Sequence, residues 1–295
     1  MKKAVATLLF LAAALSAFHP AAAQSFSVGY IYYPSSRLEQ EGGEPVPDAP
    51  THLRVDTLQA LLVYPVVFNE GRTQFEHTFK YNYIMFDYRY RETAPLLDSV
   101  QSFSLTSVFN HDFPSGWGVI AMVQPGFADD FHGAATTDAI TMAMVLAGSY
   151  KFSENLKVGL GAAYDNTYGE AIPLPVAKVD WTITERLWFN MVLPLYLHLT
   201  WLPFEMIGVR ASFNANGNSF HGDENRYNLR NPQLNYSAFT GELGVRWYIL
   251  RWLHLSLRGG LTFYRRFEFS DGRKSITRYD PDNCLVFQVD LGIGG

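Results

Sequence analysis

Hydrophobic and polar side chains alternate along much of this chain, and the clearest example runs from Thr73 to Asp87. The apolar members occupy odd positions, namely Phe75, Phe79, Tyr81, Tyr83 and Met85. The polar members occupy even positions, namely Gln74, Glu76, Thr78, Lys80 and Asn82. Successive side chains of a β-strand point to opposite faces, so this period of two predicts a strand with one apolar face and one polar face.

The same alternation recurs in segments that are longer than ordinary globular strands. Predicted strands fall at 25–34, 53–67, 73–88, 99–111, 117–127, 139–152, 155–165, 172–183, 206–214, 237–249, 252–267 and 284–293. The apolar stretch 187–209 resembles a membrane helix in hydropathy. Pro194 and Pro203 interrupt it, however, and Leu197, Leu199 and Trp201 keep the period of two, which favours strands.

Short and long connections between these strands alternate, as they do in outer-membrane barrels with short periplasmic turns and long outer loops. The long connections are 35–52, 89–98, 128–138, 166–171, 215–236 and 268–283. If 187–201 forms two short strands that bend at Pro194, short and long connections alternate along the whole predicted barrel. We therefore predict an all-β chain, a transmembrane antiparallel up-and-down β-barrel of about fourteen strands, with twelve as the alternative.

The first residues have the features of a secretory signal. Met1-Lys2-Lys3 is positively charged, an apolar run follows to Ala17, and Ala21-Ala22-Ala23 offers small residues for cleavage. We expect residues 1–23 to be a cleaved signal peptide and 24–295 to form the barrel domain. Cys284 is the single cysteine, which excludes an intramolecular disulfide and predicts a structural role near the last strand.

The polar face decides which side of the wall meets lipid. It carries ionisable residues at mid-strand, and facing hydrocarbon each Lys or Arg would cost about 2–4 kcal/mol. We expect them inside, as lumen-lining residues: Glu76, Lys80, Lys157, Lys178, Asp180, Arg210, Glu242, Arg246, Arg258 and Asp290. With Arg266 and Asp165 the inward set is slightly basic, which favours anions if the lumen is open; interlocked charges that close it are the alternative.

Composition adds few constraints. Hydrophobic residues make up 48% of the chain, yet the mean hydropathy is only -0.04, so apolar and polar residues are interleaved. The net charge is -5 and basic residues are scattered, which argues against a nucleic-acid partner.

These features together resemble the bacterial outer-membrane β-barrel proteins, and in particular a barrel family defined only as a domain of unknown function. The resemblance rests on Ala21-Ala22-Ala23, on Ile172-Pro173-Leu174-Pro175 leading to Trp181, on Leu193-Pro194, and on the alternation itself. It implies a Gram-negative outer membrane, with its lipid and the barrel-assembly machinery as partners. The sequence ends Leu291-Gly292-Ile293-Gly294-Gly295, without the terminal aromatic residue that such barrels commonly present.

Candidate catalytic residues are few. His254 and Ser256 share one face of a strand, and no third group can be placed beside them, which favours ordinary lumen residues. His111 is expected near the periplasmic side. Asp129, Asp130 and His132 could hold a divalent ion, but a solvated outer loop is the simpler interpretation.

We therefore predict a porin-like barrel without cofactor or metal that acts as a passive channel for small solutes or an apolar ligand, or as a structural barrel. A barrel hydrolase acting on lipid or peptide is the second hypothesis, so enzymatic activity stays open. A binding protein that uses the outer loops 35–52 and 215–236 is the third.

Overall fold

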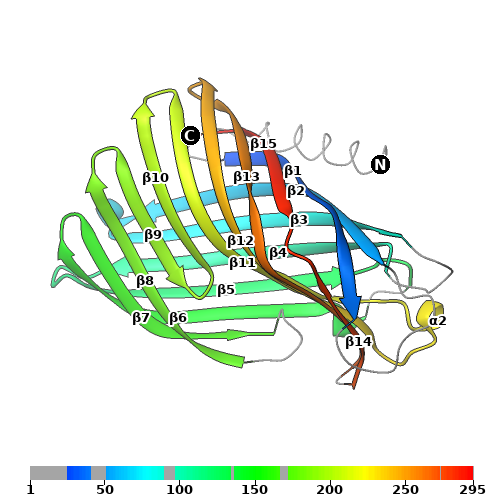
Figure 1. Ribbon diagram of the computed structural model, residues 1–295. Coiled ribbons are helices and arrows are strands. Elements are labelled where there is room, and N and C mark those ends of the chain that lie inside the picture. Colours follow the sequence, from blue (N-terminus) through cyan, green and yellow to red (C-terminus); the bar gives the residue numbers. More distant parts are fainter. Residues whose placement is uncertain are drawn as a thin grey trace.

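The computed structural model describes residues 25–40, 51–89, 97–133, 136–166, 172–272 and 274–294, so the predicted signal peptide lies outside the described residues. Almost all of the described chain is β-strand (Figure 1). The strands are β1 (Ser25–Gln40), β2 (His52–Phe68), β3 (Thr73–Arg89), β4 (Ser99–Asp112), β5 (Trp117–Asp129), β6 (Ile140–Ser153), β7 (Leu156–Asp165), β8 (Ile172–Thr184), β9 (Leu187–Leu193), β10 (Tyr196–Phe204), β11 (Ile207–His221), β12 (Pro232–Leu250), β13 (Leu253–Asp271), β14 (Lys274–Pro281) and β15 (Leu285–Ile293).

The strands form one closed antiparallel sheet. Each strand up to β13 pairs with the next along the chain, and β15 closes the ring by pairing with both β13 and β1. β14 pairs with the same two neighbours farther along, so β14 and β15 are two parts of one strand that is interrupted at 282–284. The barrel therefore has 14 strands, which confirms the predicted fold class and strand number.

The apolar stretch that could have been a helix forms the β9–β10 hairpin, as the alternation predicts. β9 has 7 residues and β10 has 9, and the chain turns between them at Pro194 and Leu195. The Leu193–Pro194 peptide bond is cis. Among the described residues, no helix has the length and hydropathy to span a membrane.

Parts of three predicted loops are strand instead. β1 continues to Gln40, β11 continues to His221 while β12 already begins at Pro232, and β14 occupies most of 268–283. The predicted boundaries were wrong there because these strands continue past the segment in which apolar residues face outward and polar residues face inward. The period of two in apolar residues does not reveal this extension. The remaining helical pieces are single turns, η1 (Asn69–Gly71), η2 (Thr137–Ala139) and α2 (Glu224–Tyr227).

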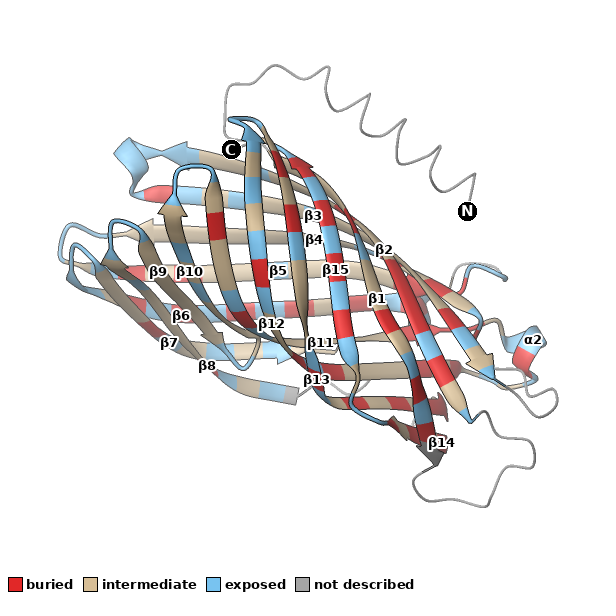
Figure 2. Ribbon diagram, turned by 45° about the horizontal axis from the view of Figure 1, so that its top comes forward, coloured by how far each residue is buried: buried red, intermediate tan, exposed pale blue. Residues whose placement is uncertain are grey.

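Through most of the wall, the apolar face points outward. In β15, Leu285, Phe287, Val289, Leu291 and Ile293 are exposed, and each residue between them is buried. This alternation is visible as coloured bands along β13 and β15 (Figure 2). Aliphatic and aromatic side chains cover the outside of the barrel and polar ones line its inside, the arrangement expected of a wall that faces lipid.

The two ends of the barrel differ. At one end the connections are short turns, such as Pro114–Gly116 and Thr184–Leu187, and both described chain ends lie there. The other end carries the longer connections and α2 (Figure 1). By the usual pattern of these barrels, the first end is periplasmic and the second is the outer end.

At the outer end the polarity of the wall is reversed. A register shift between β12 and β13 at Phe239 and Thr240 leaves Phe263 as an extra residue, after which inward positions of β13 fall on odd numbers. Arg265, Phe267 and Phe269 are consequently buried inside. Phe267 and Phe269 belong to a cluster that we call the outer core, composed of Tyr33, Leu38, Leu53, Val55, Phe86, Leu97, Val100, Ala128, Phe220, Tyr227, Leu234, Phe267, Phe269, Tyr279 and Val286.

Candidate functional site

A cavity of about 410 Å³ lies inside the barrel, below the outer core. Its lining residues come from opposite sides of the barrel and include Gln59, Asn82 and Ser104 as well as the apolar Ile84 and Met122. These side chains occupy inward positions of β2 to β5, because the register places them opposite one another across neighbouring strands. The cavity is therefore an amphipathic chamber in the lumen.

Cations outnumber acids in this chamber. Lys80, Arg210 and Arg258 line it, against Asp165 and Glu242. Arg258 is neutralised, since its guanidinium lies 2.9 Å from Asp290 and 3.6 Å from Glu242. Lys80 has no ion pair among the described residues, and Arg210 there donates only to Thr200 Oγ1 at 3.2 Å. Two positively charged side chains without an ion pair among the described residues, Lys80 and Arg210, thus face the chamber.

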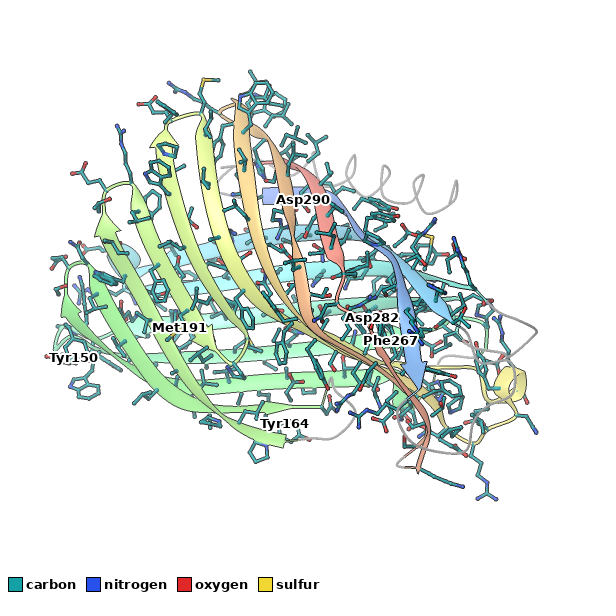
Figure 3. The ribbon with its side chains drawn as sticks, in the orientation of Figure 1. Tyr150, Tyr164, Met191, Phe267, Asp282 and Asp290 are labelled. Carbon is teal, nitrogen blue, oxygen red and sulfur yellow. The ribbon has the colours of Figure 1, made fainter. Side chains whose placement is uncertain are left out.

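The ten residues predicted to line the lumen fall into two groups. Lys80, Arg210, Glu242 and Arg258 line the chamber, and Asp290 binds one of them. The others lie closer to the periplasmic end on the inner face. Asp290 is in the wall, well away from Phe267 in the outer core (Figure 3). Contact of any of these residues with a solute stays a prediction.

Toward the periplasmic end the inner charges neutralise one another. Lys157 forms an ion pair with Asp112, and Lys178 lies 3.0 Å from Asp180, which also accepts from Asn190. Arg246 donates to Ser256 Oγ at 3.2 Å. Glu76 occupies an inward position of β3 and is exposed. This part of the lumen is therefore polar, with two of its lysines held in ion pairs.

The sequence interpretation placed Arg266 in the lumen, and this is wrong. Because of the extra residue at Phe263, Arg266 lies on the outer face, where it stacks on Tyr264 and binds Asp280 at 3.4 Å. Arg265 takes the inward position instead and is 2% exposed. A one-residue shift in register exchanges the two faces of a strand.

Arg265 is enclosed by the outer core. Its guanidinium donates to Ser36 Oγ at 2.8 Å and to Cys284 Sγ at 3.2 Å, and it lies 5.3 Å from the ring centroid of Tyr33. Its Nε and Nη2 have no hydrogen-bond partner within the described chain. Cys284 also bonds Thr262 through its backbone, which fits the structural role expected of it.

Sequence reasoning missed the outer core as a barrier. A signal for it exists, because the inward positions of β3 change from Lys80 and Asn82 to Ile84, Phe86 and Tyr88. The side chains of the outer core are buried and pack together inside the barrel above the chamber. What narrows the described barrel at this end is thus apolar packing and not interlocked opposite charges.

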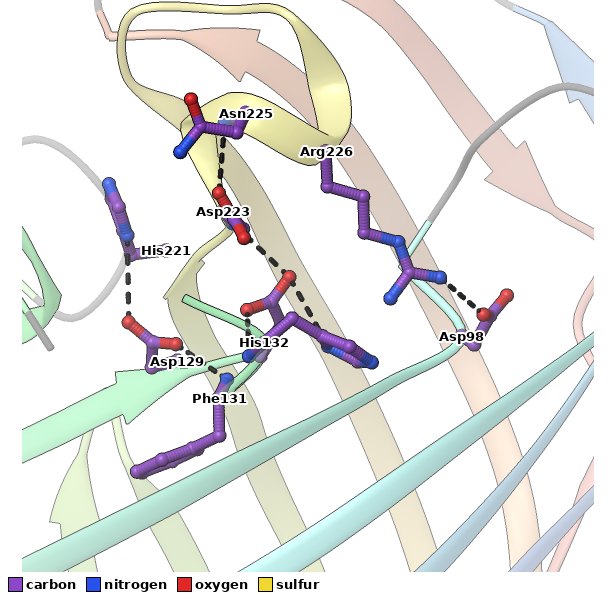
Figure 4. A network of polar contacts seen from close by, with 9 residues as sticks. Asp98, Asp129, Phe131, His132, His221, Asp223, Asn225 and Arg226 are labelled. Carbon is purple, nitrogen blue, oxygen red and sulfur yellow. Dashed lines mark hydrogen bonds and ion pairs between the residues drawn. The ribbon is translucent and has the colours of Figure 1, made fainter. Parts of the chain in front are cut away.

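Asp129, Asp130 and His132 do not form a solvated loop as expected, because both carboxylates are buried. Asp129 accepts from Phe131 N–H and lies 3.5 Å from His221 Nδ1 (Figure 4). Asp130 accepts from the N–H groups of His132 and Asp223. In the described part of the chain, no three His, Cys, Asp or Glu side chains gather as metal ligands would.

These contacts join the end of β5 to the end of β11, and we call Asp129, Asp130, His221 and Asp223 the outer latch. His221 forms a parallel bridge with Asp129, and Asp130 N–H donates to the carbonyl of His221 at 3.0 Å. α2 follows directly, with Asp223 as its N-cap. Burial raises the pKa of the Tyr227 hydroxyl well above its usual range.

The residues weighed as catalytic take structural roles. His254 and Ser256 are both buried on the inner face, but Ser256 is held by Arg246 and His254 lies beside Tyr248. His111 lies at the periplasmic end between Phe109 and Phe113, as predicted. Among the described residues no hydrogen bond joins His254 to Ser256, and His111 Nδ1 bonds Thr73 Oγ1 at 2.9 Å.

The outward apolar band, the polar inner face and the closed backbone pairing are mutually consistent. A closed barrel satisfies its backbone hydrogen bonds in a bilayer, which an open sheet cannot do. The chain is therefore an integral outer-membrane β-barrel.

Solved structures that resemble this fold are outer-membrane barrels of low sequence identity. An outer membrane channel from Pseudomonas putida F1 has a TM-score of 0.47 and 10% identity over 94% of this chain and 96% of that one. The P. putida toluene transporter TodX gives 0.45 and 11% over 94% and 91%. The translocator domain of the Neisseria meningitidis autotransporter NalP gives 0.41 and 12% over 100% and 96%.

No curated protein matches the sequence. A family model does match it, over residues 19–289, which is nearly the whole chain. The chain belongs to that family, which is described as Domain of unknown function (DUF6268).

Proposed function

We propose that this protein is a passive outer-membrane channel with a preference for anions. The observation that supports this most directly is the chamber of about 410 Å³, where Lys80 and Arg210 carry charge with no acidic partner among the described residues. A pore lined by rings or clusters of one charge selects ions of the opposite sign. The exposed inner face toward the periplasmic end provides a hydrated entrance.

The same proposal includes export by a signal peptide that is cleaved after residue 23, and insertion by the barrel-assembly machinery. The outward apolar face requires a lipid environment. Both steps are testable on membranes from expressing cells, where the mature protein is expected to begin at Gln24 by N-terminal sequencing and to fractionate with the outer membrane.

Conductance in planar bilayers tests the channel itself. The purified full-length protein is expected to give discrete current steps in potassium chloride, with a reversal potential under a salt gradient that favours chloride. The double variant Lys80→Gln/Arg210→Gln should move the reversal potential toward potassium, because it removes the uncompensated charges. Lys151→Gln, at the periplasmic turn and paired with Glu154, is the matched control. A folded protein that gives no current steps overturns the proposal.

A further inference from the structure

The wall of the barrel is incomplete beside the chamber. β8 pairs with β9 only as far as Ala177 opposite Leu193, and β11 pairs with β10 only as far as Asn214 opposite Tyr196. One more bond, from Ala215 N–H to the carbonyl of Leu195, completes the contact. The hairpin of β9 and β10 thus ends short of its neighbours (Figure 1).

Above this hairpin two strand edges have no neighbour. The edge of β8 at 172–176 pairs with β7 on one side, and the edge of β11 at 216–220 pairs with β12 on one side. Neither edge has a strand partner on its other side within the described chain. The gap ends at the outer latch, where His221 meets Asp129. Its width at the hairpin corresponds to three strand spacings, about 14 Å.

The chamber extends to this gap. Leu174 and Val176 on the β8 edge line it, as do Asn216 and Asn218 on the β11 edge, and Pro194 and Leu195 form the floor. We call these six residues the lateral portal. One edge is apolar and the other carries amides, so the opening is amphipathic like the chamber behind it.

The level of the portal places it next to the outer leaflet. β10 has 9 residues, which at about 3.3 Å each and a tilt near 45° rise about 21 Å, close to the ~25 Å apolar band of such barrels. An outward aromatic group marks the same level, because the Phe213 ring centroid lies 5.9 Å from Phe239 and 6.2 Å from Phe263. Phe213 and Asn214 adjoin the floor of the portal.

The unpaired edges of β8 and β11 are consistent with a water-filled opening. Unpaired backbone N–H and C=O groups do not face hydrocarbon, and they are tolerated at membrane depth where they line a water-filled cavity. Directly above the chamber lies the packed outer core, including Phe220, Phe267 and Leu234. A sideways route through the gap avoids this packed region.

We propose that the lateral portal passes amphipathic anions, molecules with an apolar tail and an anionic head, between the chamber and the boundary of the outer leaflet. The head is attracted by Lys80 and Arg210, and the tail contacts Leu174, Val176 and the chamber's apolar residues. This inference rests on the proposed channel function and names its route and solute class.

A reversible bridge across the portal tests this route. Leu174→Cys and Asn218→Cys are introduced together with Cys284→Ser, and the full-length protein is bridged by a bis-maleimide with a reducible spacer matched to the gap. The control pair Phe75→Cys and Leu146→Cys lies on the outer face, away from the chamber, across three spacings of intact wall from β3 to β6. Heat-dependent mobility in electrophoresis verifies that each variant is folded.

The measured quantity is release from proteoliposomes of a fluorescent alkyl sulfonate, which is permanently charged, against an alkylammonium of equal chain length. We expect the bridge to slow sulfonate release at least tenfold and reductant to restore it. Capping by a monofunctional maleimide and bridging of the control pair should each change release by less than twofold. The alkylammonium should leave at least fivefold more slowly than the sulfonate.

Each other outcome is decisive. Sulfonate release that is unchanged by the bridge, or slowed equally by the control bridge, refutes the portal. Chloride conductance without any sulfonate release refutes the portal and leaves the channel proposal intact. Absence of both from the folded protein refutes both proposals.

Discussion

β13 passes through two regions of opposite construction. From Leu253 to Phe263 its outward side chains are apolar, as at Leu257, and its inward ones are polar, as at Arg258. From Tyr264 to Asp271 its outward positions carry Arg266 and Glu268, and its inward ones carry Phe267 and Phe269. The lower region is organised for lipid outside and water inside, and the upper region is organised like a water-soluble protein.

This difference shows that the solvent around a strand, and not the strand itself, sets which face is apolar. A single extra residue at Phe263 changes the parity between the regions. The upper region has water on its outer surface, so burial of apolar side chains inside it is favourable in the usual way. The extra residue at Phe263 thus separates a lipid-facing part of β13 from a part that is built like a soluble protein.

The largest expected effect is loss of packing in the outer core. Phe267→Ala should lower the free energy of unfolding by about 3–5 kcal/mol, because a rigid core leaves a cavity. Phe287→Ala, on the lipid-facing surface, should cost less than half of that, since lipid chains close around the shorter side chain. Urea unfolding in lipid vesicles measures both. Equal losses at the two sites would contradict the distinction between the regions.

The reverse substitution probes the outer surface of each region. Leu257→Arg should cost about 2–4 kcal/mol, because it places a charge against hydrocarbon. Ile276→Arg, which is equally exposed but lies on β14 in the upper region, should change stability by no more than about 0.5 kcal/mol. The same unfolding measurement applies, and a comparable penalty at Ile276 would mean that lipid reaches the outer end.

Adjacent arginines of β13 allow a smaller test. Arg265 is buried with two unpaired nitrogens, so Arg265→Met should stabilise the protein by about 1–2 kcal/mol. Arg266→Met removes only a half-exposed ion pair with Asp280 and should cost at most about 1 kcal/mol. The two substitutions should therefore change the free energy of unfolding in opposite directions. Destabilisation by Arg265→Met would indicate that this guanidinium has an unrecognised anionic partner.

The smallest effect concerns the outer latch. Asp130→Asn weakens the acceptor for the Asp223 N–H and should cost about 1 kcal/mol of local stability. Amide hydrogen exchange at 222–231 should accelerate about fivefold, while Asp138→Asn, at an exposed position of η2, leaves it unchanged. Unchanged exchange in the Asp130 variant would show that the latch does not hold this connection.

The lipid-facing wall could be predicted from the sequence because it depends on local periodicity. Leu253 to Phe263 and Leu285 to Ile293 alternate strictly, and the strand number followed from the regular order of turns together with the bend at Pro194. The lumen charges were predicted by the same reasoning. Their pairing was not, since whether Arg258 is neutralised and Arg210 is not depends on neighbours on other strands, such as Asp290, which lies 32 positions from Arg258.

The sequence by itself determined the class of the protein, because a period of two with ionisable residues on one face leaves a barrel in a membrane as the consistent solution. Only the tertiary structure decided where that pattern ends. The extra residue at Phe263, the outer core around Arg265 and the short hairpin beneath the lateral portal all arise from register between distant strands. Register is fixed by pairing across the whole sheet, so no single segment encodes it.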